Sequence, residues 1–186
     1  MKRSQLPPTP GQTVGPFYGF ALPYDGDRNL VPTDHPGAVR LHGTVRDGRG
    51  DPVPDALLEI WQADSDGVVP QRPGSLRRDG VTFTGWGRAA TDDAGRYSFT
   101  TVEPGATDDG RAPFIAMTVL ARGLLNRLFT RVYLPGAAAL ASDPLLASLP
   151  DGRRATLVAQ RDDESLLFDV TLQGDGETVF LRYPGH

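Results

Sequence analysis

The sequence predicts an all-β protein, a β-sandwich with an extended N-terminal arm and one short helical segment. Short runs in which apolar and polar residues alternate recur along the chain, as expected for strands with one buried face. Glycine and proline, 22 and 17 in number, stand between these runs rather than in one tract. Hydrophobic residues still make up 39% of the 186 residues, so the pattern indicates turns between strands and not disorder.

The predicted strands begin where the alternation begins. From Ala38 to Arg46 apolar residues alternate with polar ones, and a turn signal follows at 47–50. Further strands are predicted at 56–62, 87–91, 97–102, 114–121, 128–133, 154–160, 166–173 and 178–182. The Ala/Leu-rich stretch 135–149 is the helical candidate, because Asp143 precedes Pro144 as an N-cap precedes proline at the first helical position.

The chain is predicted to form one domain with an extension. Residues 38–186 make up the β-sandwich domain, and residues 1–37 form a Pro/Gly-rich arm with little periodicity. Apolar residues in this arm, among them Phe17 and Tyr24, indicate that it packs on a surface, since ordering a free arm would be costly.

Composition excludes several classes of function. The absence of cysteine excludes disulfides, zinc-thiolate sites and thiol catalysis. The net charge is −4 and no basic run offers a track for phosphates, so we expect no nucleic-acid partner. No apolar run reaches the roughly 18 residues of a membrane span, and residues 1–10 lack the apolar core of a signal peptide. The expectation is a cytoplasmic protein with no membrane contact.

The residues that could hold a metal are scattered. His35, His42 and His186 stand in a loop, on the polar face of a strand and at the C-terminus, and we expect all three to be solvated. The segment 64–67 carries only part of a calcium-loop pattern. Composition and spacing alone therefore predict a β-sandwich without a metal and give no function.

Longer sequence blocks carry a resemblance. They lie at 9–18, 43–47, 52–64, 83–91, 95–99, 104–105, 168–170 and 174–180, so that together they extend over nearly the whole chain. The most specific is Glu59-Ile60-Trp61-Gln62-Ala63. In these blocks the chain resembles the intradiol ring-cleaving dioxygenases. The resemblance implies a β-sandwich of the intradiol dioxygenase or prealbumin-like type.

The resemblance also marks where metal ligands would stand. Catalytic members of the family hold ferric iron with two tyrosines and two histidines, ligands that suit this ion. The histidines stand in an Arg-x-x-His-x-His stretch, which is matched here by residues 111–116. The four matching positions, hereafter the ligand-matching positions, are occupied by Val69, Thr107, Phe114 and Ala116. The resemblance thus implies that these positions are vestigial, and that this chain holds no metal and no catalytic residue of its own.

The same resemblance implies a division of labour between two chains. An iron-free alpha subunit would pair with a homologous beta subunit that carries Fe(III), in an (αβ)n assembly. The complex would cleave protocatechuate with O2 to 3-carboxy-cis,cis-muconate. The arm would pack on the partner chain and its pocket, and Thr13, Gly15, Pro16 and Arg122 would bind the substrate.

Physical chemistry favours Arg122 for that role, since a guanidinium grips a carboxylate through two hydrogen bonds and stays charged. Alternatives remain at the level of sequence. Arg122 is otherwise a surface ion-pair residue, and the 13–16 segment a turn that anchors the arm. Arg111 matches an arginine near the reacting carbon, or is a structural ion-pair residue. The whole chain is alternatively a non-enzymatic binding or scaffold module, or a homomeric intradiol pseudoenzyme.

Overall fold

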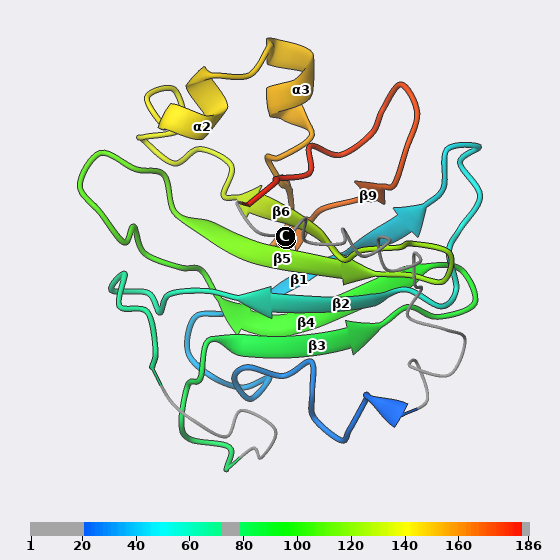
Figure 1. Ribbon diagram of the computed structural model, residues 1–186. Helices are drawn as coiled ribbons and strands as arrows, with labels where there is room; N and C mark the ends of the chain where they lie inside the picture. Colours follow the sequence, from blue (N-terminus) through cyan, green and yellow to red (C-terminus); the bar gives the residue numbers. More distant parts are fainter. Residues whose placement is uncertain (1–20, 72–78, 184–186) are drawn as a thin grey trace, which may run out of the picture.

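A computed structural model describes residues 21–71 and 79–183, and in this part of the chain nine strands form two sheets (Figure 1). The strands are β1 (Ala38–Arg46), β2 (Leu57–Trp61), β3 (Trp86–Ala90), β4 (Arg96–Val102), β5 (Phe114–Leu120), β6 (Leu128–Tyr133), β7 (Gln160–Asp162), β8 (Ser165–Leu167) and β9 (Val170–Thr171). The helices described are short: α2 (Pro144–Ala147) and α3 (Asp151–Ala155). The predicted all-β class is confirmed.

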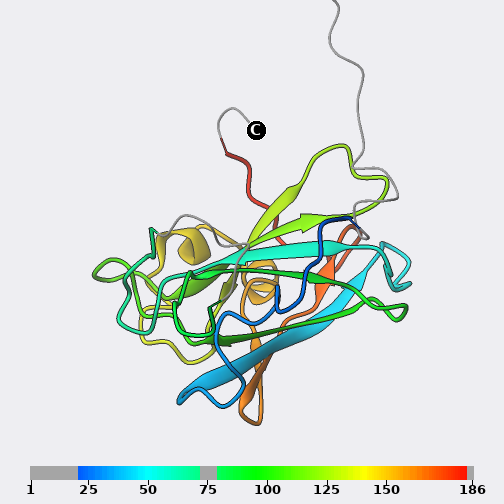
Figure 2. The same cartoon turned by 90° about the horizontal axis from the view of Figure 1, so that it is seen from below.

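The two sheets form the layers of a sandwich (Figure 2). One sheet has the order β4-β1-β8-β7, with β9 also paired to β1; β1 runs antiparallel to β4 and parallel to β8 and β9. The other sheet has the order β3-β2-β5-β6 and is antiparallel throughout. We call the side of this second sheet that is turned away from the sandwich core its outer face.

Side chains that alternate along the strands fill the space between the sheets. Leu41, Val45 and Phe99 from the first sheet are fully buried, and so are Leu58 and Ile115 from the second. Burying a side chain of this size contributes roughly 1.5–3 kcal/mol. The core therefore fixes which residues of each strand face inward and which reach the outer face.

The predicted helix at the Ala/Leu-rich stretch is confirmed as α2. The Asp143 carboxylate accepts hydrogen bonds from the backbone N–H groups of Leu145 and Leu146, at 3.0 and 3.2 Å, and Pro144 opens the helix. This satisfies two of the N–H groups that a helix leaves unpaired at its start.

Three predictions about the C-terminal third are wrong. Residues 151–155 form helix α3, so the strand predicted at 154–160 is wrong, and so is the expectation of one helical segment. Asp151 in its first turn and Arg153 and Arg154 in its last suit the helix dipole, a signal that favoured a helix. The strand predicted at 178–182 is reduced to a single bridge between Phe129 and Leu181.

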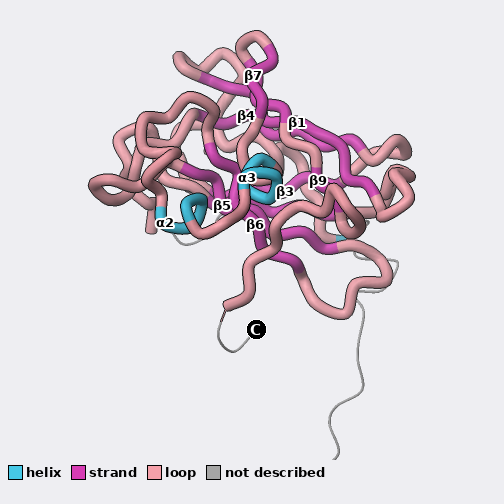
Figure 3. Tube along the Cα trace, turned by 90° about the horizontal axis from the view of Figure 1, so that it is seen from above, coloured by secondary structure: helices cyan, strands magenta, loops and turns pink. Residues whose placement is uncertain are grey.

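Helices α2 and α3 cover a second apolar cluster beside β6. Tyr133, Leu146 and Leu157 are fully buried in it. Figure 1 places both helices at the top of the molecule, and Figure 3 shows them from above, with α3 near the centre and α2 to one side. The Arg154 side chain of α3 links the two helices, because its Nε donates a hydrogen bond to the backbone oxygen of Leu146 in α2 at 2.9 Å. Neither of these two helices has the length or the apolar character needed to cross a membrane, a finding limited to the described residues.

Gly43 in β1 marks a close approach that tests this architecture. A Cβ added there would lie 1.9 Å from the backbone oxygen of Phe168. We expect Gly43→Ala to lower the free energy of unfolding by about 3 kcal/mol, because the obstacle is backbone and cannot rotate away. Urea denaturation measures the change.

Gly152→Ala in α3 is the matched control. Nothing lies within 4 Å of a Cβ added there, so we expect no loss, or a gain of up to about 1 kcal/mol from helix propensity. Equal stabilities of the two variants would contradict the predicted contact.

Candidate functional site

Strand β5 sets the position of two ligand-matching residues. Ile115, Met117 and Val119 point into the core and are at most 1% exposed. Because side chains alternate along a strand, Phe114 and Ala116 reach the outer face. The two positions that match the family's histidines thus lie on the outer face of the sheet, at the start of β5.

The neighbouring strand leads to the same end of the sheet. Trp61, the last residue of β2, pairs with Ala116 in β5. The loop that follows turns sharply at Asp64, whose Oδ1 accepts the backbone N–H groups of Asp66 and Val68 at 3.0 and 2.9 Å. Asp64 is therefore a turn-capping carboxylate, the role expected of aspartate in turns.

The loops that carry the other two ligand-matching positions contact each other through their backbones. The N–H of Gly105 donates to the backbone oxygen of Asp64 at 2.7 Å. A Cβ on Gly67, which has φ +84°, would lie 2.1 Å from the backbone oxygen of Ala106. Val69 and Thr107 follow directly after these contacts. The fold thus brings both loops to the end of the sheet where β2 ends and β5 begins.

The side chains at these positions do not fit a ferric ion. Val69, Phe114 and Ala116 have no lone pair, and the neutral hydroxyl of Thr107 lies 3.4 Å from the carboxylate of Asp108. Across residues 21–71 and 79–183, no three or more His, Asp or Glu side chains gather so as to hold a metal. The side chains at these four positions therefore differ from the two tyrosines and two histidines of the catalytic members and could not coordinate the ion in the same way.

An arginine that sequence reasoning did not single out lies between two of these positions. Arg131 in β6 is directly opposite Ala116, and its guanidinium carbon lies 4.0 Å from the centre of the Phe114 ring. Its Nη1 donates to the hydroxyl of Tyr133 at 3.2 Å. Its Nε is buried without a hydrogen-bond partner in the described part of the chain. The cation–π contact with Phe114 is thus the interaction that offsets the loss of hydration when this end of the guanidinium is buried.

Tyr133 links Arg131 to helix α2. Its hydroxyl donates to Oδ1 of Asp143 at 3.1 Å, and Asp143 is 2% exposed. Burial raises the pKa of Tyr133, so the phenol stays protonated at neutral pH and acts as a donor. Tyr133 thus combines burial in the second apolar cluster with a polar link to helix α2. Strand register was the signal that could have found Arg131, since β6 places it on the outer face beside Ala116.

Arg122 lies at the other end of the sheet. It follows the end of β5, and six residues of strand, about 20 Å, separate Phe114 from Leu120. Nε of Arg122 pairs with Oδ2 of Asp55 at 3.0 Å, and the Arg122 side chain is 63% exposed. The structure therefore does not bring Arg122 together with the ligand-matching positions of this chain.

Thr13, Gly15 and Pro16 lie outside the described residues. The described part of the arm does contact the second sheet: Leu22 accepts a hydrogen bond from Arg88 of β3 at 2.8 Å, and Tyr24 stacks on Trp86 with 6.5 Å between ring centres.

The two tryptophans differ. Trp86 contacts both the Tyr24 ring and the Arg88 guanidinium, whose carbon is 5.1 Å from its ring centre. Trp61 is 52% exposed on the outer face beside Ala116. Trp61 is therefore not a core residue.

The remaining candidates are polar and separate. The Arg111 side chain is half exposed, and its Nε lies 3.7 Å from Oδ2 of Asp108. This geometry favours the alternative in which Arg111 is a structural ion-pair residue. His42 differs from the expectation of solvated histidines, because its side chain is 22% exposed and its Nε2 lies 3.0 Å from Oγ of Ser165. Asp162 approaches the same nitrogen, at 3.5 Å, so the three side chains lack the geometry of a catalytic triad.

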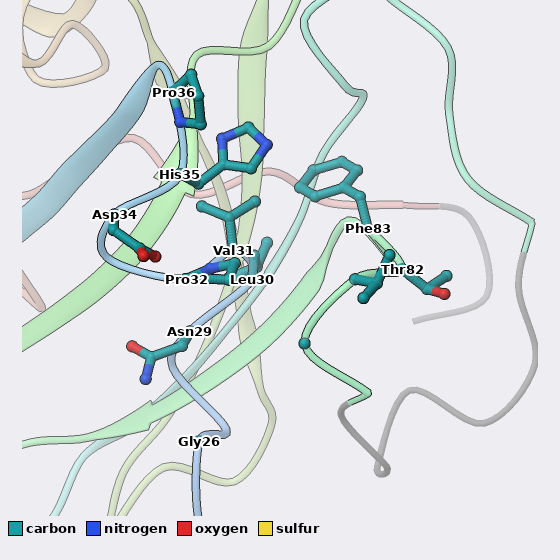
Figure 4. Close-up of a pocket in the computed structure, with 12 residues that line it drawn as sticks. Gly26, Asn29, Leu30, Val31, Pro32, Asp34, His35, Pro36, Thr82 and Phe83 are labelled. Atoms are coloured by element: carbon teal, nitrogen blue, oxygen red, sulfur yellow. The ribbon is translucent and has the colours of Figure 1, made fainter.

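A cavity lies apart from these positions. It has a volume of about 640 Å³ and lies between residues 26–36 and 80–83. Figure 4 shows the rings of His35 and Phe83 side by side at this cavity, with Val31 below His35 in that view. The lining is mostly apolar and contains neither Arg122 nor a ligand-matching position. Among the described residues that line it, His35 is the one histidine, and His186 lies outside the described residues.

Comparison with known proteins places the chain and its fold in one family. The family model described as Dioxygenase matches residues 13–174. The chain is 42% identical to the protocatechuate 3,4-dioxygenase alpha chain of Burkholderia cepacia, over 95% of this chain and 98% of that relative. It is 33% identical to the beta chain of the same organism, over 97% of this chain and 82% of that relative.

A solved structure agrees with these relatives. The dioxygenase domain of a dioxygenase and carbohydrate-binding protein fusion from Streptomyces sp. SirexAA-E aligns with a TM-score of 0.59 and 26% identity. The alignment covers 90% of this chain and 99% of that domain. The chain therefore belongs to the intradiol ring-cleavage dioxygenase family.

Proposed function

We propose that this chain is the iron-free alpha subunit of a protocatechuate 3,4-dioxygenase. It would pair with a homologous beta subunit that holds Fe(III), in an (αβ)n complex that cleaves protocatechuate with O2 to 3-carboxy-cis,cis-muconate. One observation carries the proposal: all four ligand-matching positions lack a ferric ligand, in a chain that resembles an alpha chain over almost its full length. The greater identity to the alpha chain than to the beta chain supports the same assignment.

The outer face is suited to a homologous partner. Trp61 is exposed there, and the loop beside it exposes Val68 and Val69, apolar surface of the kind that interfaces cover. Two homologous chains that pair through equivalent faces around a pseudo-two-fold axis bring opposite ends of those faces together. Arg122, at the far end of this sheet, would then approach the metal-bearing end of the partner's sheet.

Arg122 would orient the substrate. Protocatechuate carries a carboxylate, and a guanidinium fork can hold it in a fixed direction. Asp55 engages Nε, while the exposed side chain has further N–H groups at Nη1 and Nη2. In the same proposal the arm, residues 1–37, packs on the partner, and Thr13, Gly15 and Pro16 line its pocket.

The first prediction concerns the chain alone. Purified without a partner, the full chain should show no protocatechuate-dependent O2 uptake and no visible absorption from tyrosinate-bound iron. Co-expressed with a histidine-bearing homologue, it should form a complex with equal numbers of the two chains and consume O2. Native mass spectrometry and an oxygen electrode measure both.

Other outcomes identify the rivals. Stoichiometric iron with turnover in the isolated chain would refute the iron-free assignment. A homomeric assembly that ignores the co-expressed chain would favour the pseudoenzyme, and a monomer with no partner would favour a binding or scaffold module.

The second prediction concerns the carboxylate. In the complex, Arg122→Ala should raise KM for protocatechuate about 10- to 100-fold, or roughly 1.4–2.8 kcal/mol, because the variant cannot hold the carboxylate. Turnover of catechol, which has no carboxylate, should change little. Steady-state O2 uptake with both substrates makes the measurement.

The control is Arg161→Ala, which removes an exposed arginine paired with Glu103 at an edge of the other sheet. It should leave KM for protocatechuate and the turnover of catechol unchanged. An unchanged KM for protocatechuate in Arg122→Ala, or an equal rise for catechol, would remove Arg122 from carboxylate binding.

A further inference from the structure

We propose that Arg131 is a fixed cation that fills the place of the metal, so that this chain would bind a metal poorly there even with the family's ligands restored. The inference deepens the proposed function, since it rests on matching Phe114 and Ala116 to the family's histidines. It goes beyond that proposal by assigning exclusion of metal to a residue outside the four ligand-matching positions.

Strand register puts the guanidinium at both histidine-matching positions. Ala116 and Arg131 are directly opposite in the antiparallel pair β5 and β6, so their Cβ atoms lie about 5 Å apart. Alanine has only a methyl group, which leaves the space beside it open to the longer side chain. The guanidinium turns toward Phe114, with its carbon 4.0 Å from the ring centre. One cation thus occupies the outer-face space that two imidazoles would share.

The guanidinium is held there by more than the ring. Nη1 donates to the Tyr133 hydroxyl at 3.2 Å, and that hydroxyl donates to Asp143 at 3.1 Å. Asp143 is buried and caps helix α2 through Leu145 and Leu146. Arg131 is therefore tied through two hydrogen bonds to a helix start, and moving it aside would disturb that chain of contacts.

Electrostatics then opposes a metal. A di- or trivalent cation bound at residues 114 and 116 would lie within a few ångströms of the guanidinium, which stays charged at every working pH. The nearest carboxylate in this network, Asp143, is separated from Arg131 by the Tyr133 hydroxyl and is engaged by the helix. If only the ligands were restored, the bound metal ion would therefore be repelled by the guanidinium, and this network of hydrogen bonds would not offset that repulsion.

The test restores the ligands with and without the cation. The full chain carrying Val69→Tyr, Thr107→Tyr, Phe114→His and Ala116→His is compared with the same chain that also carries Arg131→Gln. Glutamine keeps hydrogen-bonding capacity but has no charge. Titration calorimetry with Co²⁺ alone should show binding at least about tenfold tighter in the chain that carries Arg131→Gln.

A matched control separates local charge from net charge. Arg161→Gln in the four-ligand chain removes the same charge at an edge of the other sheet and should leave Co²⁺ affinity unchanged. Equal affinity with and without Arg131, including no binding by either chain, would overturn the proposal. No partner chain and no turnover enter this experiment, so its failure is distinct from failure of the proposed function.

A second measurement avoids the redesigned chain, which carries many substitutions. In the otherwise unchanged chain, Arg131→Gln, Phe114→Leu and the double variant are compared by thermal unfolding. Because both single changes remove one cation–π contact, the double variant should lower Tm by less than the sum of the singles. Additive shifts would show that Arg131 is not held on Phe114 and would overturn the proposal.

Discussion

The alternation of side chains along β5 is the constraint on which the rest of this face depends. Ile115, Met117 and Val119 are anchored in the core, and a shift of one residue would exchange them with polar or outward positions. Phe114 and Ala116 are thereby fixed on the outer face, whatever their side chains are. The geometry of a metal-binding face can thus persist when its donor atoms are replaced, because the core and not the metal sets the register.

Because the core and not the ligands sets the strand register, much of the fold could be predicted from the sequence alone. Alternation found β1, β4, β5 and β6 with bounds close to those observed, because each is long and has one buried face. It failed at 154–160, where Asp151 and the arginines after it made a helix. Short apolar runs do not by themselves distinguish a strand from a buried helix segment.

The candidate site was predictable in part, for a related reason. Matching short motifs locates Phe114 and Ala116 because they are adjacent in sequence to Arg111. Arg131 and Asp143 lie 15 and more residues further along, and only strand pairing and the helix cap bring them to the same place. Sequence motifs identify residues that are close along the chain, whereas the residues of one sheet face come from segments that are distant in sequence. His42 was misjudged likewise, since Ser165 meets it only through the pairing of β1 with β8.

If this face is a former metal site, as the proposed function holds, loss of the metal would change its mechanics as well as its chemistry. A bound ion would join the start of β5 to the two loops beside β2. Here the loops are joined by backbone contacts at Gly67 and Gly105, and β5 is joined to β6 and α2 through Arg131. Each link is weaker than a coordination bond but needs no cofactor. In the proposed function, such links would let the chain hold its shape without iron, as a subunit must if its task is to present a rigid wall and a guanidinium to a site in another chain.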